Sequence, residues 1–122
     1  NKINQFEKKF AKVIINLCIH YPKHYQNKNN IFHITNRGYT NWYKVSAEIE
    51  SAYYEQTKKI NKKSLITPIS FKQWESKAKR PTDSRLQIDE DLLKNINSDM
   101  SYWKDAVREM VRAYLLMGEK NN

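Results

Sequence analysis

The chain has 122 residues, which is enough for one hydrophobic core but not for two independent ones. It contains two glycines and three prolines, fewer turn residues than an all-β protein of this size needs, so the composition favours helices joined by loops. The formal net charge of +9 favours polyanionic partners, and a single cysteine, which excludes an internal disulfide, indicates an intracellular location, nuclear or cytoplasmic.

The first expected helix covers residues 6–21, where apolar residues recur at spacings of three and four. Pro22 ends it, because the proline ring disfavours helical geometry in the residue before it. The longest apolar run, VIINLCI at 13–19, is interrupted by Asn16 and is far too short to span a bilayer. No membrane contact is therefore expected.

A long asparagine-rich connection, residues 23–39, leads to a second expected helix. Either Thr40 or Asn41 can cap its start, and it should run to about Lys59. Its expected core face is formed by apolar and aromatic residues at helical spacing: Trp42, Val45, Ile49 and Tyr53.

A third helix is expected at 68–80, in the stretch TPISFKQWESKAKRP. Thr67 is a suitable N-cap, Pro68 fits the first helical position, and Pro81 stops the helix. A buried stripe is expected from Phe71, Trp74 and Ala78. That packing would turn the cationic side chains of the helix towards solvent.

The sign of the charge changes after Pro81, where acidic residues gather between Asp83 and Asp91. We therefore expect a helical core at 1–81 and a C-terminal packing or interaction element at 82–122. A last helix, residues 101–117, has a wide apolar face that either completes the core or binds a protein partner or a second copy of the chain. The residues assigned to that contact are Trp103, Val107, Met110, Tyr114 and Met117.

Three stretches carry a family resemblance: HYPKHYQNKNNIF, NWYKVSAEI and FKQWESKAKR. With a tryptophan early in the second helix and another midway along the third, they resemble the Myb/SANT-like helix-turn-helix domains, in particular the MADF group. The stretch DEDLLKNINSDM resembles the BESS interaction motif that often follows such domains. The resemblance implies an all-α fold with a three-helix helix-turn-helix core and an additional C-terminal helical element.

The same resemblance implies a non-enzymatic, accessory or regulatory subunit that binds double-stranded DNA, with 68–80 as the recognition helix in the major groove. Phosphate and base contacts would come from long polar side chains on that helix and from lysines that precede it. These residues are Lys72, Gln73, Ser76, Lys77, Lys79 and Arg80, with Lys59, Lys62 and Lys63.

Two alternatives remain open from the sequence. One is a helical protein-interaction subunit of a larger nucleic-acid-modifying complex, and the other is a small basic toxin-like ribonuclease using His20, His24 or His33. No catalytic set and no glycine-rich phosphate loop is evident, so we expect neither catalysis nor a cofactor. Cys18, His20, His24 and His33 lie close in the sequence, but we expect no metal site, because Pro22 spoils the helical alignment of His20 with His24.

Overall fold

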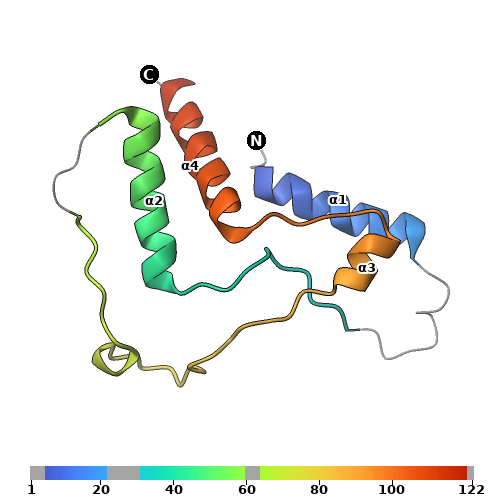
Figure 1. The fold of residues 1–122 in the computed structure, drawn as a ribbon, viewed down its shortest axis with the longest axis horizontal. Coiled ribbons are helices and arrows are strands. Elements are labelled where there is room, and N and C mark those ends of the chain that lie inside the picture. Colours follow the sequence, from blue (N-terminus) through green and yellow to red (C-terminus); the bar gives the residue numbers. More distant parts are fainter. Residues whose placement is uncertain (1–4, 22–30, 60–63, 121–122) are drawn as a thin grey trace.

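The computed structural model describes residues 5–21, 31–59 and 64–120. Within these ranges it contains four α-helices, one short 3-10 helix and no strand, so the prediction of an all-α fold is confirmed. The α-helices are α1 (Gln5–His20), α2 (Trp42–Thr57), α3 (Glu90–Asn95) and α4 (Trp103–Lys120), and the 3-10 helix is η2 (Phe71–Gln73) (Figure 1). None of the helices in these ranges combines the length and apolar character that crossing a bilayer requires.

Helix α4 lies between α1 and α2 and contacts both (Figure 1). Ala52 is the one fully buried residue of α2. Arg108 joins the two helices: its Nε lies 2.7 Å from Glu48 Oε1 and its Nη1 lies 2.7 Å from Glu55 Oε2. The start of α2 is fixed by Asn41, whose side chain accepts a hydrogen bond from the backbone N–H of Lys44.

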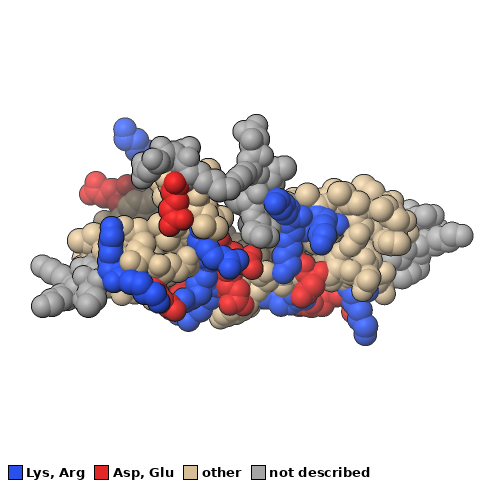
Figure 2. All heavy atoms as spheres, turned by 90° about the horizontal axis from the view of Figure 1, so that it is seen from above, with Lys and Arg blue, Asp and Glu red and all other residues tan. Residues whose placement is uncertain are grey.

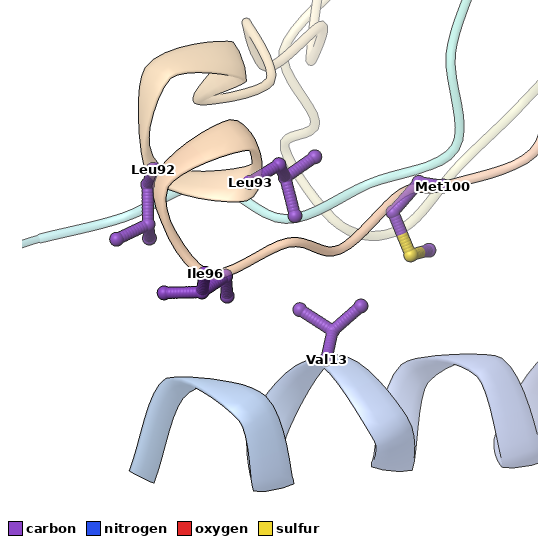
Figure 3. Close-up of a cluster of buried hydrophobic side chains, with 5 residues drawn as sticks. All are labelled: Val13, Leu92, Leu93, Ile96 and Met100. Atoms are coloured by element: carbon purple, nitrogen blue, oxygen red, sulfur yellow. The ribbon is translucent and has the colours of Figure 1, made fainter. Parts of the chain in front are cut away.

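The hydrophobic core joins α1 to α3 and to the loop that follows α3. Five buried side chains form it: Val13, Leu92, Leu93, Ile96 and Met100. Figure 3 shows Val13 pointing up from α1 towards the side chains of α3. Asp89 caps α3 by accepting a hydrogen bond from the backbone N–H of Leu92, which allows a helix of six residues to present its leucines to α1.

Arg37 ties the segment 31–41 to the second half of the chain. Its backbone N–H donates to the carbonyl of Ser101 at 2.8 Å, and its own carbonyl accepts from the N–H of Trp103 at 3.0 Å. Its guanidinium donates to Glu90 at 2.7 Å and also binds Asp99. The next residue is Gly38, at φ +85°, where a Cβ would collide with the ring of Tyr102.

The helix expected at 68–80 does not form. Of this stretch only Phe71–Gln73 is helical, as η2, and the rest has no regular structure. The N-cap is Ser70 rather than Thr67. Trp74 is exposed, so it does not form the buried stripe that we predicted with Phe71 and Ala78.

The physical reason is that this stretch is not covered by the described part of the chain. It runs as part of a long connection that passes outside the helices (Figure 1). A helix of this length is marginal in water unless its apolar face is covered. The hydroxyl of Ser76 also accepts from the backbone N–H of Ala78, a local bond that competes with helical pairing.

The core predicted for the second helix is also partly wrong. Trp42, placed first in that core, is 83% exposed at the N-terminal end of α2. Val45, Ile49 and Tyr53 are half-buried, whereas the fully buried position of α2 belongs to Ala52. The helices predicted at 6–21, from residue 41 to about 59 and at 101–117 do form.

These burial values predict a large loss of stability for one substitution and almost no change for another. Leu92→Ala should reduce the free energy of unfolding by about 2–5 kcal/mol, because it leaves a cavity in the core. Trp74→Ala should change the free energy of unfolding by less than about 0.5 kcal/mol, because the indole is 47% exposed and lies outside the core. Urea unfolding followed by far-ultraviolet circular dichroism measures both, and an unfolded Trp74→Ala variant would contradict this account of the core.

A second prediction concerns acid. The hydrogen bond from Arg37 lowers the pKa of Asp99, so its pairing stabilises the fold above the ordinary carboxyl pKa of about 3.9 and is lost as the pH falls through the lowered value. The pair is exposed, so its contribution should be below about 1 kcal/mol. When the pH is lowered from about 5 to about 2, the urea concentration at the midpoint of unfolding should therefore fall less for Asp99→Asn than for the parent chain. Parallel curves of this midpoint against pH would contradict the prediction.

Candidate binding cleft

Two adjoining hollows form one open cleft between the segments 35–39 and 83–90. The larger hollow has a volume of about 530 Å³ and is lined by Tyr39, Asp83, Arg85 and Gln87. The smaller has a volume of about 290 Å³ and shares Tyr39 and Gln87 with the larger. Its other lining residues are Thr35, Asn36, Arg37, Gly38, Leu86, Ile88 and Glu90.

Arg85 is the cationic group of the larger hollow, and two neighbours fix its position. Its Nε lies 2.8 Å from Asp83 Oδ1, and its Cζ lies 5.1 Å from the centre of the Tyr39 ring. The hydrogen bond from Arg85 lowers the pKa of Asp83 to about 2, so this carboxylate is ionised at neutral pH. Nη1 of Arg85 has no hydrogen-bond partner among the described residues, which leaves a charged donor for a ligand.

The smaller hollow holds an unpaired polar atom. Oδ1 of Asn36 is buried and has no hydrogen-bond partner in the described part of the chain. The indole N–H of Trp103 is also buried and also lacks a hydrogen-bond partner among the described residues. This indole lies against Gly38, which lines the smaller hollow. Buried polar groups in proteins are nearly always paired, so these two atoms are exceptions, and a ligand group can reach them only if neighbouring side chains shift.

The walls of the cleft are held together by Arg37. Two of its guanidinium nitrogens bind the two carboxylate oxygens of Glu90, at 3.1 Å and 2.7 Å. Arg37 comes from the first wall and Glu90 from the second, and both line the smaller hollow. A bidentate pair of this kind fixes the spacing of the two walls.

The residues predicted to bind nucleic acid do not form one cationic face of a helix. Lys72, Gln73, Ser76, Lys77, Lys79 and Arg80 lie on the irregular exposed stretch around η2. Lys59 lies at the end of α2, with its amine 5.8 Å from the centre of the Tyr53 ring. Lys62 and Lys63 lie outside the described residues. On the face shown in Figure 2, cationic and anionic side chains alternate.

The residues predicted to bind a partner through the last helix divide into two groups along α4. Trp103 is buried and Val107 is half-buried, so both belong to the fold of this chain. Met110, Tyr114 and Met117 are exposed. The apolar residues that recur regularly along this part of the sequence therefore lie partly inside the fold and partly at its surface.

The histidines and the cysteine of the described ranges form no candidate metal site. Cys18, His20 and His33 are exposed, and His24 lies outside the described residues. No group of three or more histidine, cysteine, aspartate or glutamate residues in the described ranges has a geometry that could hold a metal ion.

The cleft was not predicted from the sequence. Asp83 was expected only as part of an acidic boundary, and no role was predicted for Asn36 or Arg85. Two local signals were available: an aspartate two residues before an arginine, which suits a short-range pair, and one of only two glycines, beside Tyr39. The pairing of segments some fifty residues apart has no such local signal.

Comparisons with known proteins correct the functional prediction. A search of curated proteins and a search of solved structures give no significant match. A family model described as the RmlD substrate binding domain matches residues 7–116. This match overturns the resemblance to Myb/SANT-like and MADF domains. It also overturns the predicted DNA-binding regulatory function, with its double-stranded DNA partner and the two alternatives. Because the match covers nearly the whole chain, the protein belongs to the RmlD substrate binding domain family.

Proposed function

We propose that the cleft between segments 35–39 and 83–90 binds a sugar nucleotide, and that this chain acts as a substrate-binding domain and is not itself an enzyme. The family assignment supports a substrate-binding role. The ligand class follows from the cleft, which offers a cation, an aromatic ring and amide side chains. A sugar nucleotide carries the matching groups, namely phosphates, a flat base and sugar hydroxyls.

The observation that carries the proposal is the unpaired Oδ1 of Asn36. A buried acceptor without a donor costs about 1–3 kcal/mol, and a ligand that draws the Asn36 amide out into the hollow, where a sugar hydroxyl can donate to it, recovers that loss. The amide of Gln87, which lines both hollows, is placed to contact further hydroxyls. This part of the cleft therefore suits the sugar.

The larger hollow suits the phosphates and the base. Nη1 of Arg85 can donate to a phosphate oxygen, and charge-assisted bonds of this kind are among the stronger hydrogen bonds in proteins. Asp83 keeps the guanidinium in place and remains ionised at neutral pH because its pKa is about 2. The exposed ring of Tyr39 offers a surface on which a base can stack.

A dinucleotide cofactor does not fit the described residues. Such cofactors are held by a glycine-rich turn between a strand and a helix. The chain has Gly38 and Gly118 as its two glycines, and the described ranges form no strand. The proposal therefore includes no step that uses a dinucleotide. An intracellular location, nuclear or cytoplasmic, remains part of it.

Arg85→Ala should weaken binding of UDP-glucose by about 10- to 100-fold, because a charge-assisted hydrogen bond contributes about 1.5–3 kcal/mol. Isothermal titration calorimetry on the full chain measures this change. Arg112→Ala, which removes an exposed arginine of α4 outside the cleft, is the matched control and should bind like the parent chain.

Asn36→Leu tests the sugar part of the cleft separately. It removes the unpaired acceptor, so affinity for UDP-glucose should fall while affinity for UDP, which has no glucose, stays the same. Equal losses for both ligands would place the sugar elsewhere. Failure of UDP-glucose and of other sugar nucleotides to bind the parent chain would overturn the proposed function.

A further inference from the structure

A second surface, distinct from the cleft, is formed by residues 64–81, which we call the arm. Every residue of the arm except Ile66 is exposed. It includes four large apolar side chains that are at least 47% exposed to water: Leu65, Ile69, Phe71 and Trp74. Such a group of neighbouring exposed apolar side chains generally marks a contact surface.

The arm has local order of its own. Phe71 and Trp74 pack edge to face with ring centres 6.4 Å apart, and the Arg80 guanidinium lies 6.0 Å from the Trp74 ring. The start of η2 is held by a reciprocal capping box between Ser70 and Gln73. These contacts hold the two aromatic rings together on an outlying loop (Figure 1).

The arm is also cationic. It carries four basic residues against a single acidic one, Glu75. The basic residues are Lys72, Lys77, Lys79 and Arg80, all of them exposed and none in an ion pair with a described residue. A matching partner must offer negative charge and an apolar layer at the same place.

We infer that the arm binds the surface of an anionic lipid bilayer. Aromatic and aliphatic side chains enter the boundary between headgroups and acyl chains, and neighbouring lysines and arginines remain among the lipid phosphates. The arm supplies both kinds of side chain within eighteen residues, and neither of the two hollows of the cleft includes any of them. Binding at the surface needs no membrane-spanning helix.

The inference is independent of the proposed function. The arm ends at Pro81, before Asp83, the first residue of the second wall of the cleft, and it contributes no side chain to either hollow. Substitutions in the arm should therefore leave sugar-nucleotide binding intact, and loss of one activity does not imply loss of the other.

The first test is sedimentation of the full chain with vesicles of phosphatidylcholine, with and without phosphatidylglycerol. Binding is expected only to the anionic vesicles. Each lysine near such a surface contributes about five-fold in affinity, so replacing Lys72, Lys77 and Lys79 by Ala should reduce partitioning about 100-fold. The control replaces Lys12, Lys44 and Lys94, which are equally exposed, and should change partitioning far less.

The second test separates insertion from charge attraction. Replacing Phe71 and Trp74 by Ala should weaken binding to the anionic vesicles, whereas replacing Trp42 and Tyr43, which are exposed at the start of α2, should not. In a variant with Trp42→Phe, lipids brominated on the acyl chain should quench the fluorescence of exposed Trp74 more than that of buried Trp103.

Three results would overturn the inference. They are the absence of binding to anionic vesicles, equal binding to neutral and anionic vesicles, and equal losses in the arm variants and their controls. Circular dichroism checks that the helices persist in every variant; the arm variants change no α-helix, and the control variants change only exposed positions of α1, α2 and α3.

Discussion

The contacts of Arg37 are the interactions on which the arrangement of the loops and helices depends. It binds Glu90, Asp99 and the carbonyl of Met100, while its backbone pairs with Ser101 and Trp103. The core beside it is small. Through these contacts Arg37 fixes segment 31–41 against α3, the following loop and the start of α4, while the buried apolar side chains supply the larger part of the stabilisation.

The same contacts of Arg37 also hold the cleft in place. Its walls are irregular segments, and loops held by a rigid framework are where proteins commonly place binding residues. Arg37 and Glu90 bring the two walls together, and Asp83 and Tyr39 then fix Arg85 from opposite walls. The binding groups are thus positioned by two ion pairs, one that sets the distance between the walls and one that orients the cation.

The sequence predicted those parts of the structure that depend on residues close together in the chain. Periodic apolar residues and the cap at Asn41 predicted α1, α2 and α4, because helical spacing and capping involve residues close in the chain. Residues 68–80 show the limit of this approach: the pattern was helical, but the described part of the chain does not cover Trp74. The cleft joins segments some fifty residues apart, so its pairing could not be read from periodicity, and the resemblance to a DNA-binding domain then assigned the exposed lysines to the wrong partner.

The path of the connection between α2 and α3 has a consequence for the integrity of the chain. Helices α1 and α2 precede this connection, yet α1 packs against α3 and α4, and α2 packs against α4. The exposed lysines of this connection, Lys72, Lys77 and Lys79, are sites at which trypsin can cut the chain. A chain cut there would consist of two fragments whose helices contact each other, α1 with α3 and α4, and α2 with α4.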